Sequence, residues 1–83
     1  MSLRIVFDEK AIDQAAEFLA DDPGGLHAVL AAIDQLADDP RPAESFPYGS
    51  HHRRLRVGRY RVMYEIDGDE VVVGHIARRR PER

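Results

Sequence analysis

Residues 51–78, HHRRLRVGRYRVMYEIDGDEVVVGHIAR, alternate apolar and polar side chains over most of their length. An alternation with a period of two is typical of β-strands that bury one face. Gly58 interrupts it with a turn, and Asp67-Gly68 is a strong hairpin signal. The run at 70–78 is nearly continuously apolar, as in strands covered on both faces. The stretch therefore predicts three consecutive antiparallel strands, of which the last is central.

The N-terminal part predicts a strand followed by a helix. LRIVF, residues 3–7, is short, apolar and rich in β-branched residues. Asp8 is a suitable N-cap for a helix over about 9–20, and the acidic Glu9 suits its first turn. Apolar residues recur in this segment at helical spacing, so we expect one buried stripe made of Ile12, Ala15, Ala16 and Leu19.

A second helix is predicted from Asp22 as cap and Pro23 in the first turn, although Gly24 and Gly25 weaken its start. It should end near residues 38–40. The connection between the two helices is so short that we expect an antiparallel hairpin. The expected buried stripe of the second helix consists of Leu26, Val29, Leu30, Ile33 and Leu36.

Residues 40–50, PRPAESFPYGS, predict a loop, with a short strand around 45–48 that Pro47 would keep at a sheet edge. A chain of 83 residues has room for a single domain, 1–83. The order β-α-α-β-β-β predicts an α+β fold. We expect a twisted antiparallel sheet of four strands with the helical hairpin packed on one face.

Composition excludes several classes of protein. Hydrophobic residues make up 43% and charged residues 33%, which argues against disorder and against a membrane protein. The start, MSLRIVFDEK, lacks the layout of a signal peptide, so we expect a cytoplasmic protein. Cysteine is absent and no HExxH or other ligand-spaced set occurs, so we expect neither a metal site nor a cofactor.

The net charge of −3 hides a division between the two halves of the chain. Residues 1–50 hold three Lys or Arg against ten Asp or Glu, a balance of −7, whereas residues 51–83 hold nine Arg against five Asp or Glu, a balance of +4. Such asymmetry indicates a polyanion or an acidic partner for the basic half. The alternative is that the two halves neutralise each other across the fold.

Strand parity places the arginines together. If the apolar side chains of the two strands before the hairpin face the helices, then Arg54, Arg56 and Arg61 all face the other way. Arginine offers a planar fork of donors that matches phosphate oxygens, so this face suits a phosphodiester. Arg78, Arg79 and Arg80 would extend the patch. Alternatively, the arginines form a solvated face, or they snorkel over apolar surface while they pair with Glu65, Asp67 and Asp69. The predicted inward residues are Leu55, Val57, Tyr60, Val62, Tyr64 and Ile66.

Histidines are the candidate proton-transfer groups of the basic half. Arginine has no base form near neutrality, so His52 or His75 would act as the base, with His51 beside the substrate. The structural alternatives are a surface pair at His51 and His52 and an ordinary strand residue at His75. Tyr48, in the Pro-rich loop, is a candidate for stacking on a base.

Two motifs carry a family resemblance. The pattern R-x-G-x-Y-R-V-x-Y at residues 56–64 and HIARR at 75–79 resemble the C-terminal signature of the RelE/ParE superfamily of toxins from bacterial type II toxin–antitoxin systems. With the preceding strand and helices, the resemblance covers essentially the whole chain. RelE-type members cut messenger RNA in the ribosomal A site, and ParE-type members poison DNA gyrase. HIARR is more similar to the RelE type, which we therefore expect.

The resemblance also implies roles for residues. A RelE-type enzyme lets a 2′-hydroxyl attack the adjoining phosphate; Arg61 would hold that phosphate, and Arg54 and Arg56 lie where the family places cationic groups. Arg79, or Arg78 in the alternative register, matches the Arg that ends the last strand. The chain departs from the pattern in two places. Its only lysine is Lys10, far from the patch, and its end, RRRPER, lacks the Tyr or His that many members carry.

Partners are implied in the same way. The superfamily resemblance implies a cognate antitoxin that wraps over the toxin, with a heterotetramer as one form of the complex, and it implies the ribosome and messenger RNA as targets. The expected catalytic set is Arg61, Arg54, Arg79, His52 and His75, and the expected substrate-binding set is Arg56, Arg78, Arg80 and His51.

Overall fold

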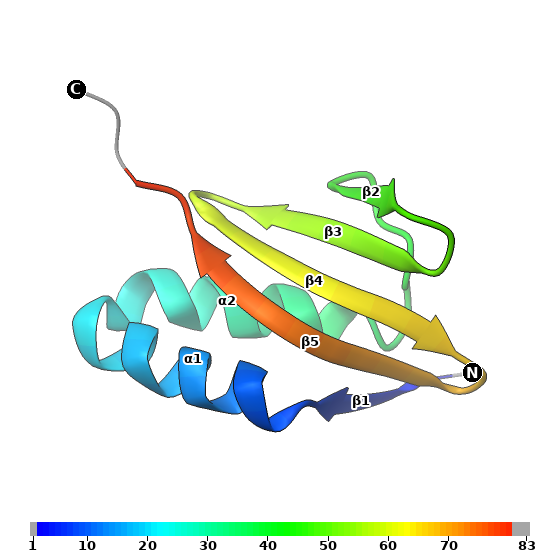
Figure 1. Cartoon of the computed structure of the whole chain (residues 1–83), viewed down its shortest axis with the longest axis horizontal. Helices are drawn as coiled ribbons and strands as arrows, with labels where there is room; N and C mark the ends of the chain where they lie inside the picture. Colours follow the sequence, from blue (N-terminus) through cyan, green and yellow to red (C-terminus); the bar gives the residue numbers. More distant parts are fainter. Residues whose placement is uncertain (1, 81–83) are drawn as a thin grey trace.

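Five strands form one sheet in the order β1-β5-β4-β3-β2 in the computed structural model, which describes residues 2–80 (Figure 1). The chain end Pro81–Arg83, where the tail Tyr or His of the resemblance is missing, lies outside the described residues. The helices are α1 (Glu9–Asp21) and α2 (Pro23–Gln35), and the strands are β1 (Arg4–Phe7), β2 (Ser45–Tyr48), β3 (His52–Val57), β4 (Tyr60–Asp67) and β5 (Glu70–Arg78).

The three C-terminal strands confirm the prediction from periodicity. β3, β4 and β5 pair antiparallel in sequence order, and β5 is central because β1 and β4 flank it. Gly58 and Gly68 occupy the connecting turns with φ of 58° and 62°, which other residues adopt only with strain. β2 pairs with β3 at the edge of the sheet. Pro47 has no backbone N–H to donate, and an edge strand tolerates this because one of its sides has no neighbouring strand.

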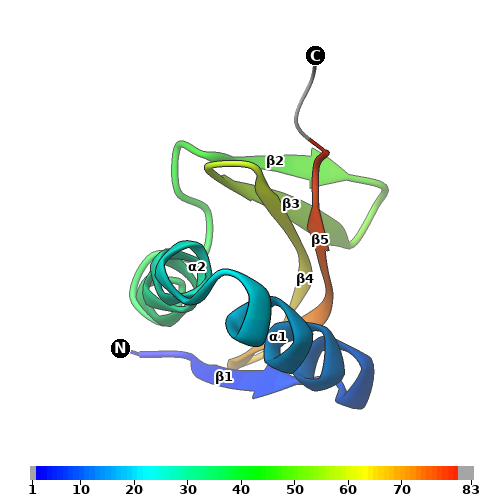
Figure 2. The same ribbon diagram turned by 90° about the vertical axis from the view of Figure 1, so that its left-hand side faces the viewer.

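The direction of β1 corrects the prediction of a purely antiparallel sheet of four strands. β1 runs parallel to β5, with Ile5 opposite Val71 and Phe7 opposite Val73, so the sheet is mixed and has five strands. An alternation of period two reports which face of a strand is buried but not the direction in which the strand runs. The predicted α+β class, with both helices packed on one face, is confirmed, and Figure 2 shows the sheet curving around them.

The α2 stripe is confirmed, because Leu26, Val29 and Ile33 are buried and Leu36 is buried just beyond the helix. Asp22 caps this helix and accepts a hydrogen bond of 3.2 Å from the backbone N of Gly25. These side chains and the inward residues of β3, β4 and β5 form the core. Neither helix of the described chain is long and apolar enough to cross a membrane.

The predicted stripe of α1 was correct at Ala15, which packs against the core, and wrong by one residue at its other positions. Ile12 and Leu19 are exposed, 53% and 38%, whereas Ala11 is fully buried and Phe18 packs against the core. One residue turns a helix face by about 100°, and the alanine-rich α1 offers apolar residues on both candidate faces. The choice is made by contacts in the folded chain: the ring of Phe18 meets that of Tyr60 edge to face at 5.4 Å.

Candidate nucleic-acid interface

The outward side of the sheet carries Arg54, Arg56 and Arg61 together, which we call the cationic face. Arg56 lies directly opposite Arg61 in the β3–β4 ladder, and Arg54 lies opposite Met63. Leu55 and Val62 point the other way and are buried, so the parity prediction is confirmed. Side chains opposite each other on adjacent strands have Cβ atoms about 5 Å apart, close enough for two guanidinium groups to share one ligand.

No arginine of the cationic face forms an ion pair within residues 2–80. The ion pairs of that range are Arg4–Glu70, His52–Glu65, Arg59–Asp22 and Arg78–Asp21. The alternative in which the face pairs with Glu65, Asp67 or Asp69 is therefore not what the described residues adopt. Two like charges opposite each other destabilise a sheet, and an anionic ligand would remove that repulsion.

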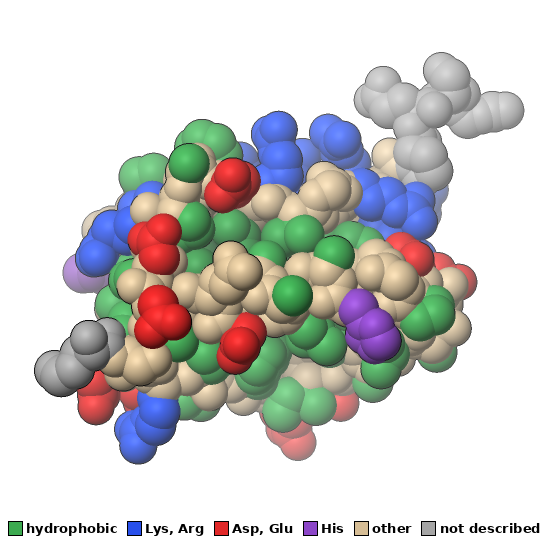
Figure 3. All heavy atoms as spheres, turned by 180° about the vertical axis from the view of Figure 1, so that it is seen from behind, with side chains coloured by type: hydrophobic (Ala, Val, Ile, Leu, Met, Phe, Trp, Pro, Cys, Tyr) green, Lys and Arg blue, Asp and Glu red, His purple; other side chains and the backbone are tan. Residues whose placement is uncertain are grey.

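The acidic half neutralises other cations instead. Arg78 and Arg59 reach the carboxylates of Asp21 and Asp22, at the turn between the helices. Figure 3 shows the molecule from behind, with Asp and Glu side chains spread over the view and Lys and Arg gathered mainly toward its upper border. The two halves of the chain thus compensate part of each other's charge, while the arginines of the cationic face form no ion pair in the part of the chain that the structure describes.

His52 lies on the cationic face, two residues before Arg54 on β3. Its Nε2 is 3.3 Å from Oε1 of Glu65, which is directly opposite on β4, and its side chain is 52% exposed. A carboxylate beside an imidazole fixes the orientation of the ring, as in many general bases. His51 is exposed in the turn before β3.

His75 is held in one tautomer. Oε1 of Gln14, on α1, accepts a hydrogen bond of 2.7 Å from the backbone N–H of Ile76, so the amide NH₂ of Gln14 faces His75. That NH₂ donates to Nδ1 of His75 at 2.9 Å. A neutral ring whose Nδ1 accepts carries its proton on Nε2. His75 lies opposite Met63 and thus on the outward side, where this tautomer presents Nε2–H as a donor.

The three arginines at the end of β5 separate. Arg78 turns inward: its guanidinium donates to Asp21 at 2.6 Å and lies 4.9 Å above the ring of Phe18. Hydrogen bonds to Asp21 and Tyr60 raise the pKa of Arg78 above its usual value. Arg79 and Arg80 are exposed. Arg78 thus joins the sheet to α1, and of the two candidates for the arginine that ends the last strand, Arg79 is the exposed one.

Sequence reasoning missed Phe46 and did not place Tyr48 on this face. Both point outward from β2, opposite Arg54 and His52, and they are 48% and 52% exposed. The guanidinium of Arg54 lies 5.7 Å from the centre of the Tyr48 ring. The signal in the sequence was the alternation of Ser45, Phe46, Pro47 and Tyr48. Exposed aromatic rings beside arginines are suited to stacking on bases.

The described residues contain no cluster of three His, Cys, Asp or Glu side chains that could hold a metal ion. The site therefore consists of guanidinium groups, two histidines and two exposed aromatic rings on one side of a sheet. Groups of these kinds can bind phosphate oxygens, stack on planar rings and, at His52, transfer a proton.

A family described as the ParE toxin of the type II toxin–antitoxin system, parDE, matches residues 8–82. The chain belongs to the ParE toxin family. The resemblance to the RelE/ParE superfamily is thereby confirmed, and the chain is a toxin of a type II toxin–antitoxin system. The comparison with curated proteins gives no match.

Solved structures of both branches share the fold of this ParE-family chain. The RelBE2 toxin–antitoxin complex of Mycobacterium tuberculosis matches with 24% identity and a TM-score of 0.79, over 95% of this chain and 100% of the other. The RelE–RelB complex of Pyrococcus horikoshii matches with 19% identity and a TM-score of 0.77, over 95% of this chain and 97% of the other. The chromosomal ParDE system of Pseudomonas aeruginosa matches with 11% identity and a TM-score of 0.76, over 95% of this chain and 98% of the other. The fold is common to RelE and ParE and does not separate them.

Proposed function

We propose that this toxin is a ribosome-dependent endoribonuclease that cleaves messenger RNA. The observation that carries the proposal is the cationic face, whose arginines form no ion pair within residues 2–80, next to the His52–Glu65 pair. A protein that only bound a polyanion would need the arginines alone. An exposed imidazole oriented by a carboxylate adds a group that can take part in proton transfer.

The reaction is an attack by the 2′-oxygen of a nucleotide on its own 3′-phosphorus. His52 accepts the proton of the 2′-hydroxyl, the new P–O2′ bond forms, and the P–O5′ bond breaks. The products are a 2′,3′-cyclic phosphate and a 5′-hydroxyl, whose proton comes from water or from the ribosome. Arg61, with Arg54 and Arg56 beside it, stabilises the charge on the phosphate oxygens, and preorganised donors of this kind contribute roughly 3 kcal/mol each. Arg79 and His75 donate from the side of β5.

A cognate antitoxin neutralises the toxin in the cytoplasm. The M. tuberculosis and P. horikoshii structures are of toxins bound to their antitoxins, which supports the same arrangement here, with a heterotetramer as one form of the complex. The exposed aromatic rings of β2 and the acidic helices offer surfaces for such a partner.

The second candidate is inhibition of DNA gyrase without nuclease activity. It is favoured by the match of residues 8–82 to the ParE family. A gyrase inhibitor needs no proton-transfer group, so in this case the His52–Glu65 pair would be an ordinary cross-strand contact.

The test adds purified toxin to a translating extract and maps the ends of the messenger by primer extension. We expect new ends with wild type, none with Arg61→Ala, and wild-type cleavage with the control Lys10→Ala, an exposed cation on α1. Intact messenger together with inhibited supercoiling in a gyrase assay would replace the first candidate with the second. Pre-incubation with the antitoxin should abolish either activity.

A further inference from the structure

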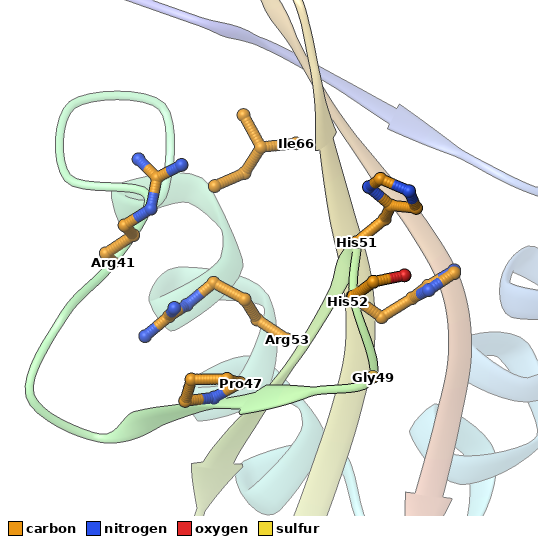
Figure 4. Close-up of a pocket in the computed structure, with 8 residues that line it drawn as sticks. Arg41, Pro47, Gly49, His51, His52, Arg53 and Ile66 are labelled. Atoms are coloured by element: carbon orange, nitrogen blue, oxygen red, sulfur yellow. The ribbon is translucent and has the colours of Figure 1, made fainter.

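A second basic site lies on the other side of the β2–β3 hairpin. A cavity of about 240 Å³ is bounded there by Arg41 of the loop before β2, by Pro47, by His51 and Arg53, and by Ile66 of β4 (Figure 4). Among residues 2–80, no carboxylate lines it. Parity gives Arg53 the inward orientation, opposite to Arg54 and Arg56, so the cavity is distinct from the cationic face.

The guanidinium of Arg53 is fixed by one neighbour. Its Nε and Nη2 donate to Oγ of Ser45 at 3.0 and 2.9 Å, and Nη2 also donates to the carbonyl oxygen of Ser45 at 3.2 Å. Ser45 is only 6% exposed and its hydroxyl donates to the carbonyl of Pro42 at 3.0 Å. One edge of the guanidinium is therefore used by the protein, and Nη1 remains available for a ligand.

Arg41 lies in a backbone bend whose two neighbours are hydrogen-bonded to the rest of the fold. It lies between Pro40 and Pro42, whose rings restrict the backbone. The carbonyl of Pro40 accepts a hydrogen bond of 2.6 Å from the hydroxyl of Tyr64, and the carbonyl of Pro42 accepts one of 3.0 Å from the backbone N of Ser45. Within residues 2–80 Arg41 forms no ion pair. Two guanidinium groups thus border one cavity that no carboxylate of the described residues lines, an arrangement that favours an anion.

We propose that this cavity binds a phosphate group of the RNA strand, a few nucleotides from the phosphate held on the cationic face. The inference rests on the proposed function. His52 lines the cavity and also pairs with Glu65 on the outward side, so the His51–His52 turn is the border between the two sites. A strand that crosses this turn meets guanidinium groups on both sides of the hairpin. The site would give affinity and register, and the chemistry would stay on the cationic face.

The first test measures the salt dependence of binding with a single-stranded RNA that carries 2′-O-methyl groups and cannot be cleaved. For single strands the slope of log K against log[salt] is about −0.7 per phosphate contact. We expect Arg41→Gln to make the slope shallower by about 0.7. Lys10→Gln removes the same charge from α1, near the opposite edge of the sheet, and should leave the slope unchanged. Arg41 makes no side-chain hydrogen bond within the described chain, so its loss should not affect folding.

The second test follows the Nε–Hε resonances of the arginines by ¹⁵N NMR while inorganic phosphate is added at constant ionic strength. The Arg53 resonance should shift with added phosphate and reach saturation, and it should not respond to chloride. A response to phosphate together with an unchanged salt slope for RNA binding would mean that the site takes free phosphate. That outcome would overturn the assignment of the site to RNA. Equal slopes for Arg41→Gln and Lys10→Gln, or displacement of phosphate only by an acidic peptide, would also overturn it. Messenger cleavage in the extract reports separately on the proposed function.

Discussion

The hydroxyl of Tyr60 donates a hydrogen bond of 3.0 Å to Oδ2 of Asp22, which joins the start of β4 to the turn between the helices. Tyr60 is buried, and the guanidinium of Arg59 lies 3.9 Å from the same carboxylate oxygen. Beside this contact, Arg78 pairs with Asp21. The end of the sheet that carries Arg56 and Arg61 is thus joined to the helical hairpin through Asp21 and Asp22.

Replacing Gly25 should destabilise the protein, whereas replacing Gly24 should not. A Cβ at Gly25 would lie 2.1 Å from Oδ2 of Asp22 and 3.1 Å from Cε1 of Tyr60, but at Gly24 it would meet no atom within 4 Å. Alanine in a helix is favoured over glycine by up to about 1 kcal/mol, so Gly24→Ala should raise the free energy of unfolding. Urea titrations of Gly25→Ala and Gly24→Ala measure the difference. Equal stabilisation by both would contradict the packing around Asp22.

Asp22 should make stability depend on pH in the acid range. Hydrogen bonds from the backbone N of Gly25 and from Tyr60 hold the pKa of Asp22 below its usual value of 3.8. A folded-state pKa below the unfolded one means that the contribution is present above about pH 4 and is lost as the pH falls through the lowered pKa. Thermal melting from pH 6 to pH 2.5 should therefore show wild type and Asp22→Asn converging at low pH. If the difference in Tm between wild type and Asp22→Asn stayed constant over this pH range, Asp22 would not be the cause of the pH dependence.

Arg61→Ala should lose activity without losing stability. Arg56 and Arg61 are directly opposite each other, and a like-charge pair in this position costs a fraction of a kcal/mol. We therefore expect a Tm equal to or above that of wild type, together with loss of messenger cleavage. The matched control is Arg4→Ala, which breaks the exposed pair with Glu70 and should leave cleavage intact. A lower Tm for Arg61→Ala would indicate a structural role instead.

The two histidines should differ in both tautomer and function. Long-range ¹H–¹⁵N spectra should report His75 as the Nε2–H form, and Gln14→Ala should release the ring to a mixture of tautomers.

In the translating extract, His52→Gln should lower cleavage by roughly 10²-fold or more, as expected for loss of a general base. Full activity of His52→Gln would exclude His52 as the base, whatever the state of His75.

Tyr48 should contribute stacking energy to RNA binding. Removing an aromatic ring that stacks on a base costs about 1–3 kcal/mol, so Tyr48→Ala should weaken binding to an uncleavable single strand, whereas Tyr48→Phe should not. An abasic strand should bind wild type and Tyr48→Ala equally. Ile12→Ala, which shortens another exposed apolar side chain on α1, serves as control. Loss of affinity for both strands would point to a change in the phosphate contacts.

Strand periodicity predicted more of the site than did the choice of residue types. Because neighbouring side chains on a strand point to opposite faces, the positions of Leu55 and Val62 were enough to place Arg54, Arg56 and Arg61 together. The same alternation at Ser45–Tyr48 is consistent with the observed position of Phe46 and Tyr48 beside them. Periodicity within one element did not decide between Arg78 and Arg79, because their roles depend on Asp21 and Phe18 of a helix distant in sequence.

The sequence by itself determined the α+β class, the two helices, the β3-β4-β5 meander and the side of the sheet on which the arginines gather. These features follow from local periodicity, caps and turns. Only the tertiary structure decided that β1 runs parallel to β5, that α1 buries Ala11 and not Ile12, that Gln14 fixes the tautomer of His75, and that Arg41 and Arg53 border one cavity. Each of these depends on residues far apart in the chain, whose contact is set by packing and by hydrogen-bond partners that no single segment contains.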